Sequence, residues 1–226
     1  MKICGLTRRE DAFAAERAGA DYLGFVLSEG FGRSVTPEAL PELVAGTTAR
    51  RVAVLVDEAL ETASERALLL GASVVQLHGE EPPELLTALR ARGGWALWKA
   101  VRPRSLEELA SEVERYRFVA DGILVEGWRD GAVGGVGARL TLDPEAVRDL
   151  IPEDLALILA GGLAPASVSG AVRDFRPDVV DVSSGVERAL GKKDHALVRA
   201  FVESVRSASG AAGSARVEPG KGKPVS

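Results

Sequence analysis

Eight short apolar runs recur along this chain at intervals of about 25 residues, and this rhythm limits its fold more than any other feature. A unit of that length has room for one strand, one helix and two short loops. Runs rich in Val, Ile and Leu suit strands that are buried on both faces. The predicted strands are Lys2–Cys4, Tyr22–Val26, Arg51–Val56, Val74–Leu77, Ala96–Val101, Gly122–Val125, Ala156–Ala160 and Val179–Val182.

The segments between these runs favour helices, with apolar residues at helical spacing and proline or glycine at several ends. The alternation predicts an α/β protein, a single (β/α)8 TIM barrel with eight parallel strands, over residues 1–206. An open doubly wound sheet is the alternative. The even spacing and the lack of a G-x-G-x-x-G motif after the first strand favour the barrel. Predicted helices include Arg8–Ala18, Leu60–Leu70, Pro83–Ala91 and Asp194–Val205.

Residues 207–226 lack apolar periodicity and are rich in Gly, Ser, Ala and Pro, so we expect a disordered C-terminal tail.

Composition restricts the compartment and the partners. The 33 acidic and 28 basic residues argue against general nucleic-acid binding. No run approaches the roughly 18 apolar residues of a membrane helix, and charges interrupt the first twenty residues. We expect a cytoplasmic monomer or homodimer that binds neither nucleic acid nor membrane.

Cysteine and histidine are scarce. The chain has one cysteine, Cys4, and two histidines, His78 and His195. A single cysteine excludes an internal disulfide. The same counts exclude a zinc site of the usual Cys/His kind, so we expect no metal.

Small residues follow the last two predicted strands. The active site of such a barrel lies at the C-terminal ends of its strands, where phosphate often binds after strands seven and eight. Gly161-Gly162 and Ser183-Ser184-Gly185 occupy these places, and their backbone N–H groups could close on a phosphate. Each group could instead be only a tight turn, but their joint placement favours phosphate binding.

Two residues at strand ends could carry acid–base chemistry. Cys4 ends the first strand, where a lowered pKa would make its thiol reactive; a small buried residue is the alternative. Glu126 ends an apolar strand, where burial would raise its pKa and suit it to be a general acid. A solvated carboxylate at the start of a loop is the alternative for Glu126.

Three further features have both a functional and a structural interpretation. Arg33 follows Phe31-Gly32 and could clamp a carboxylate or be a surface arginine. His78 could be a buried scaffold donor. The glycine-rich stretch Gly127–Gly137 suits a mobile lid, or a loop without function.

Five motifs together resemble the phosphoribosylanthranilate isomerase family of tryptophan biosynthesis. They are KICGLT at 2–7, GADYLGFV at 19–26, VVQLHGEE at 74–81, LAGGLAP at 159–165 and DVSSGVE at 181–187. The match extends from the first residue to about Arg206. Members of this family are (β/α)8 barrels that perform an Amadori rearrangement of N-(5-phosphoribosyl)anthranilate. The resemblance therefore implies this phosphorylated substrate, and no cofactor.

The resemblance also implies roles for single residues. Cys4 matches the general base, and Glu126 stands where the family has an aspartate as general acid. Arg33 matches the arginine that meets the anthranilate carboxylate. The phosphate cradle corresponds to Gly161, Gly162, Ser183, Ser184 and Gly185, and polar positions lining the site correspond to Gln76, His78 and Asp181.

The chain departs from the family pattern in two loops that face the substrate. Besides Glu126, Val136 replaces a threonine, Leu140–Leu142 replaces Phe-Asp-Trp, and Phe31-Gly32 replaces Ser-Pro. Asp130 is the alternative general acid. These departures leave two other functions open: another aldose–ketose isomerase acting on a related sugar phosphate, and a non-catalytic barrel that binds a phosphate ligand.

Overall fold

The computed structural model describes residues 1–127 and 140–211. Within them, eight parallel strands close into a barrel in chain order, with β1 paired to both β2 and β8. Each predicted strand is present with ends that differ by at most one residue, and the (β/α)8 prediction is confirmed. The strands are β1 (Lys2–Ile3), β2 (Tyr22–Val26), β3 (Arg50–Leu55), β4 (Val74–Leu77), β5 (Ala96–Val101), β6 (Gly122–Val125), β7 (Ala156–Leu159) and β8 (Val179–Val182).

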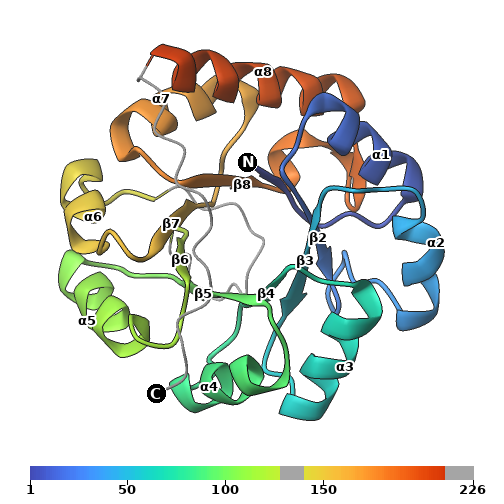
Figure 1. The fold of residues 1–226 in the computed structure, drawn as a ribbon. Coiled ribbons are helices and arrows are strands. Elements are labelled where there is room, and N and C mark those ends of the chain that lie inside the picture. The colour runs from blue at the N-terminus through green and yellow to red at the C-terminus, as the bar shows by residue number, and fades with distance from the viewer. Residues whose placement is uncertain (128–139, 212–226) are drawn as a thin grey trace.

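Helices surround the strands as an outer ring (Figure 1). A short hairpin follows β8 and joins it to the last helix; its strands are β9 (Glu187–Ala189) and β10 (Lys192–Lys193). The helices are α1 (Arg9–Ala18), α2 (Leu40–Val44), α3 (Leu60–Leu70), α4 (Pro83–Arg92), α5 (Leu106–Tyr116), α6 (Pro144–Leu150), α7 (Pro165–Phe175) and α8 (His195–Ala211), with 3-10 turns η1 (Pro37–Ala39) and η2 (Ser184–Val186).

The last helix corrects the predicted start of the tail. Disorder was expected from residue 207, but α8 continues to Ala211. Val198, Phe201, Val205 and Ala208 form one buried stripe along it, so the apolar spacing extends one turn further than the prediction allowed. The rest of the expected tail, 212–226, lies outside the described residues.

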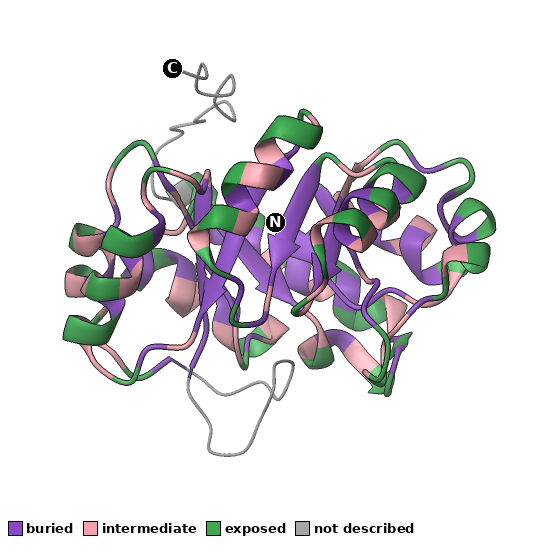
Figure 2. Cartoon of the chain, turned by 90° about the horizontal axis from the view of Figure 1, so that it is seen from below, coloured by how far each residue is buried: buried purple, intermediate pink, exposed green. Residues whose placement is uncertain are grey.

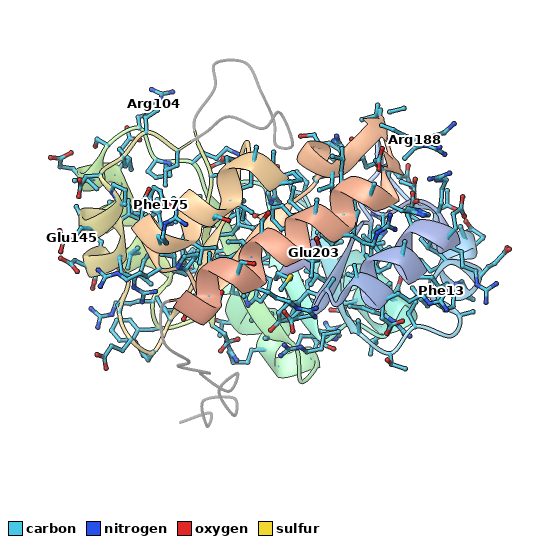
Figure 3. The ribbon with its side chains drawn as sticks, turned by 90° about the horizontal axis from the view of Figure 1, so that it is seen from above. Phe13, Arg104, Glu145, Phe175, Arg188 and Glu203 are labelled. Carbon is cyan, nitrogen blue, oxygen red and sulfur yellow. The ribbon has the colours of Figure 1, made fainter. Side chains whose placement is uncertain are left out.

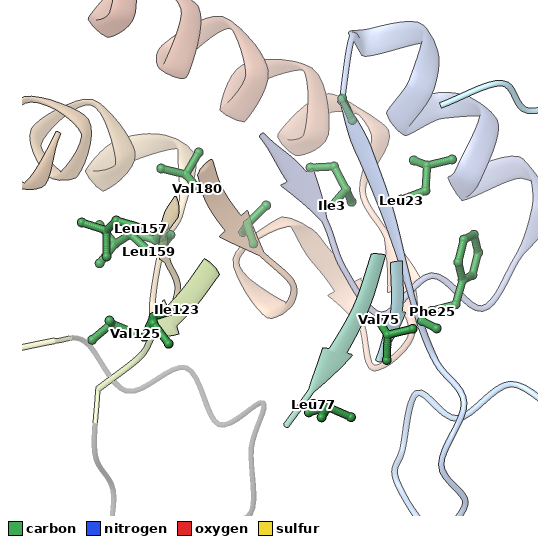
Figure 4. Packing of buried hydrophobic residues seen from close by; sticks show 14 of the residues in the cluster. Ile3, Leu23, Phe25, Val75, Leu77, Ile123, Val125, Leu157, Leu159 and Val180 are labelled. Carbon is green, nitrogen blue, oxygen red and sulfur yellow. The ribbon is translucent and has the colours of Figure 1, made fainter. Parts of the chain in front are cut away.

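The two faces of each strand bury different side chains. Ile3, Leu23 and Phe25 belong to the core layer between the barrel and the helices, which is shown in Figure 4. The alternate residues, such as Tyr22 and Trp98, fill the barrel interior, where their rings meet edge to face with centroids 5.1 Å apart. Since successive side chains in a strand point to opposite faces, every second residue belongs to the interior.

Burial follows this layering. The strands are buried, whereas the helices alternate buried inner faces with exposed outer ones (Figure 2). Among the helices in the described ranges, none has both the length and the apolar character to cross a membrane.

The loops at the C-terminal ends of the strands share one edge of the molecule. Arg104, which follows β5, and Arg188, in β9, both lie at that edge in Figure 3. A barrel of parallel strands brings the residues after each strand together there, which is why the site is built from distant segments of the chain.

Candidate active site

A pocket opens at the C-terminal ends of the strands. Every predicted site residue that the structure describes lines it, whereas Asp130 and almost all of Gly127–Gly137 lie outside the described residues. No cluster of three or more His, Cys, Asp or Glu within 1–127 and 140–211 is arranged to hold a metal ion. The predicted residues found in the pocket are Cys4, Arg33, Gln76, His78, Glu126, Gly161, Gly162, Asp181, Ser183, Ser184 and Gly185.

A buried lysine organises the side of the pocket around Cys4. The Lys2 ammonium is fully buried in the barrel interior and donates to three groups. It lies 3.2 Å from Cys4 Sγ, 2.7 Å from Gln76 Oε1 and 2.8 Å from Asp181 Oδ2. Sequence reasoning missed Lys2, although a signal existed: Lys2 and Cys4 flank Ile3, so strand alternation places both inside.

The charges around Lys2 set the protonation of this end. Burial alone would lower the pKa of Lys2, but the charge of Asp181 and the hydrogen bonds to Asp181 and Cys4 outweigh it and raise that pKa. Lys2 therefore stays an ammonium. The second carboxylate oxygen of Asp181, Oδ1, is buried and has no hydrogen-bond partner among the described residues.

Cys4 is held as a neutral thiol. Burial raises the pKa of Cys4, the charge of Asp181 adds to this effect, and Lys2 and Lys193 offset it only in part. The expected lowering of the Cys4 pKa is therefore wrong. The physical reason is that desolvation disfavours the thiolate more strongly than the shared ammonium favours it.

Glu126 forms the opposite side of the pocket. Its Oε1 accepts a hydrogen bond of 2.6 Å from Arg102 Nε and lies 3.2 Å from His78 Nε2. Arg102 also donates to the backbone carbonyl of His78, at 2.9 Å. Sequence reasoning missed Arg102, which continues the alternation of interior residues along β5 (Ala96, Trp98, Ala100).

The expected raising of the Glu126 pKa is also wrong. Burial alone would raise it, but the hydrogen bond from His78 and the charge and hydrogen bond of Arg102 hold the pKa at about 2. Glu126 is therefore a carboxylate at neutral pH. Two donors that converge on one buried oxygen are enough to reverse the effect of burial.

Arg33 is anchored by a carboxylate from the hairpin after β8. Arg33 Nε and Nη2 each donate to Glu187 at 2.8 Å, in a fork geometry, and Lys193 Nζ reaches the same carboxylate at 2.8 Å. Burial alone would raise the pKa of Glu187, but the hydrogen bonds from Arg33 and Lys193 lower it. Sequence reasoning assigned no role to Glu187 or Lys193.

The loops after β7 and β8 meet backbone to backbone. Gly161 and Gly162 have positive φ angles of 84° and 61°, which glycine adopts without strain. A Cβ atom on Gly185 would collide with the carbonyl oxygen of Leu163. Only glycine allows these two loops to approach so closely, and the pocket wall here is therefore largely backbone.

Comparison with known proteins identifies the family. Residues 1–204 match the family model described as N-(5'phosphoribosyl)anthranilate (PRA) isomerase. The chain belongs to this family. It is 40% identical over 226 aligned residues to the N-(5'-phosphoribosyl)anthranilate isomerase of Symbiobacterium thermophilum. The alignment covers 91% of this chain and 97% of the relative.

Solved structures of PRA isomerases have the same fold. That of Thermotoga maritima superposes with a TM-score of 0.80 at 34% identity, covering 91% of this chain and 98% of the other. Another was solved in complex with reduced 1-(o-carboxyphenylamino)-1-deoxyribulose 5-phosphate; it has a TM-score of 0.77 at 33% identity, with coverage of 91% and 97%. The resemblance based on the five motifs is thereby confirmed.

Membership of the PRA isomerase family gives the sequence departures a structural location. Glu126, Phe31 and Gly32 all line the pocket. Leu190 of the β9–β10 hairpin packs so close to Gly32 that a Cβ there would meet its Cδ2 at 2.7 Å. Val136 lies outside the described residues.

Proposed function

We propose that this chain catalyses the Amadori rearrangement of N-(5-phosphoribosyl)anthranilate to 1-(2-carboxyphenylamino)-1-deoxyribulose 5-phosphate, without a cofactor. The observation that carries the proposal is a thiol just after β1 and a carboxyl group just after β6 lining one pocket, beside a wall of glycine backbone and an anchored arginine. Membership of the PRA isomerase family supports the same reaction.

The reaction needs one acid and one base acting in turn. Glu126 gives a proton to the furanose ring oxygen, the C1–O bond breaks, and the nitrogen lone pair forms a C1=N bond. Cys4 as thiolate then takes the proton from C2, and the electron pair of that C–H bond forms a C1=C2 enaminol. In the last step the C2 hydroxyl loses its proton, C1 gains one, and C2 becomes the ketone, so no atom is gained or lost overall.

The rest of the pocket binds the two charged ends of the substrate. Backbone N–H groups of the two glycine-containing loops suit the phosphate, which they can approach closely. Arg33 meets the anthranilate carboxylate. The sugar lies between them, and Asp181 Oδ1, buried without a partner among the described residues, can accept a hydrogen bond from a ribose hydroxyl. The proposed phosphate cradle consists of Gly161, Gly162, Ser183, Ser184 and Gly185.

The resting protonation states are the reverse of those that the first steps require. Cys4 is a thiol and Glu126 a carboxylate. In the reactive form a proton has therefore passed from the thiol to the carboxyl group. The phosphate and carboxylate of the substrate bring negative charge into the pocket, which raises the pKa of both groups. Substrate binding thus favours the protonated acid, and formation of the thiolate depends on the Lys2 ammonium beside it.

Turnover of freshly prepared N-(5-phosphoribosyl)anthranilate tests the proposal, with the product identified by mass spectrometry. Rescue of a tryptophan-requiring strain that lacks the isomerase is the matching test in cells. No turnover and no rescue would overturn the proposal. Turnover of another sugar phosphate would favour a different aldose–ketose isomerase, and tight binding of the reduced product analogue without turnover would favour a binding protein.

A further inference from the structure

A row of polar contacts crosses the barrel interior from the base to the acid. Lys2 Nζ lies 2.7 Å from Gln76 Oε1, and Gln76 Nε2 lies 2.8 Å from His78 Nδ1. His78 Nε2 in turn lies 3.2 Å from Glu126 Oε1. The row begins on β1, passes along β4 and ends after β6, so it joins the surroundings of Cys4 to those of Glu126.

The chemistry of each group fixes the direction of this row. An ammonium only donates, so Gln76 must turn its carbonyl oxygen towards Lys2. Its amide NH2 then faces His78, and Nδ1 of the ring must accept that hydrogen bond. The single proton of the neutral ring therefore sits on Nε2, which faces Glu126.

The opposite arrangements each bring two donors together. Reversing the Gln76 amide would place its NH2 against the Lys2 ammonium. A proton on His78 Nδ1 would face the NH2 of Gln76. Gln76 is fully buried, so either change would leave a donor without an acceptor inside the barrel.

We propose that Gln76 is a positioning residue that holds His78 as the Nε2–H tautomer, so that His78 donates to Glu126. The role of Glu126 as acid rests on the proposed function. His78 and Arg102 converge on Oε1. The proton that Glu126 transfers is therefore carried by the other oxygen, Oε2, and the Nε2–H tautomer adds a second donor to Arg102 at Oε1.

Nitrogen NMR of the resting protein measures the tautomer directly. The chain has only two histidines, and His195→Gln removes the second ring signal. In protein labelled with 15N-histidine we expect a pyridine-type Nδ1 and a pyrrole-type Nε2 for His78 at neutral pH. A protonated Nδ1 in the native protein would overturn the proposal.

Two substitutions test whether Gln76 is the cause. Gln76→Glu offers acceptors to both neighbours, so we expect the His78 proton to move to Nδ1. Loss of donation to Glu126 should lower kcat about tenfold to a hundredfold, with KM changed by less than about twofold. Gln76→Met makes neither hydrogen bond and should leave a mixture of tautomers. An unchanged Nε2–H tautomer in both variants would contradict the assignment.

Val74→Thr is the matched control, since Val74 lies on the same strand and the same interior face as Gln76 but does not line the pocket. We expect it to keep both the native tautomer and the native kcat. If Gln76→Glu does not fold, the spectra of the native protein and of Gln76→Met still test the proposed role of Gln76. Native protein with the Nε2–H tautomer but no isomerase activity would contradict the proposed function while supporting the assignment of Gln76.

Discussion

The two ends of the pocket each place a buried acidic group beside a cation, and yet the groups ionise differently. At the base end, Lys2 lies between Cys4, Gln76 and Asp181, and Cys4 keeps its proton. At the acid end, His78 and Arg102 both face one oxygen of Glu126, which loses its proton. The comparison shows that the presence of a neighbouring cation does not settle ionisation. The ordinary pKa of the group, 9.0 for Cys4 and 4.5 for Glu126, and the balance of burial against charges and hydrogen bonds decide it.

Removing the thiol from the base end should cause the largest loss of activity. We expect Cys4→Ala to lower kcat/KM by about a thousandfold or more, because the variant lacks the thiolate proposed to take the C2 proton. The side chain is small, so the fold should persist, and thermal unfolding monitored by circular dichroism checks this. Native-like turnover by Cys4→Ala would exclude the thiol as base.

Changing the carboxyl group tests the other end. Glu126→Gln should lower kcat by about a hundredfold, since an amide cannot supply the proton. Glu126→Asp restores the residue expected from the family and should keep kcat within about tenfold of the native value. Single-turnover measurements would separate the chemical step from binding. Unchanged turnover in Glu126→Gln would show that Asp130 or another group is the general acid.

The shared ammonium should matter as much for stability as for chemistry. Lys2→Met leaves Asp181 buried without its partner, and we expect a loss of about 3–5 kcal/mol in the free energy of unfolding. Urea unfolding measures the loss. Lys192→Met, at an exposed lysine of β10, is the control and should change stability by less than about 0.5 kcal/mol. Equal losses of unfolding free energy in the two variants would show that Lys2 has no special role in stability.

The depressed pKa of Glu126 predicts how stability depends on pH. The pKa is about 2 in the folded protein against 4.5 for the free group, so the folded state favours the carboxylate. This contributes about 3 kcal/mol above pH 4.5, which is lost as the pH falls towards 2. The unfolding free energy of the native protein should therefore fall relative to that of Glu126→Gln across this window. Glu145→Gln, at an exposed carboxylate, should follow the native curve.

The smallest effect should come from the anchor of Arg33. Glu187→Gln keeps the shape of the side chain but removes the charge that holds the guanidinium, so we expect KM to rise a few-fold with kcat nearly unchanged. Steady-state kinetics measure both constants. Glu203→Gln, on the exposed face of α8 in Figure 3, is the control and should change neither. A lower kcat in Glu187→Gln would give Glu187 a part in the chemistry.

The fold could be predicted because its signal is local. Each strand is a short apolar run, and the barrel then decides which ends meet, so Cys4, Glu126 and the glycine loops could be placed in one pocket from spacing alone. Lys2, Arg102 and the anchoring role of Glu187 were missed because their partners are distant in sequence. The Lys2–Asp181 pair spans 179 residues.

The directions of the pKa shifts could not be predicted for the same reason. Burial could be inferred at Cys4 and Glu126, but the pKa depends on burial balanced against charges supplied by other strands. Strand alternation narrows the search for such charges, since it assigns Lys2 and Arg102 to the interior face. It does not show which carboxylate or thiol each will meet.

The brevity of β1 ties assembly of the reaction centre to correct folding. β1 contributes two residues to the barrel, and its pairing with β2 and β8 decides which way Lys2 and Cys4 point. A slip of one residue would turn Ile3 into the interior and press the ammonium into the apolar layer beneath the helices. Such a molecule would be unstable as well as inactive. The pairing of β1 therefore decides at once whether the barrel is stable and whether the base is in place.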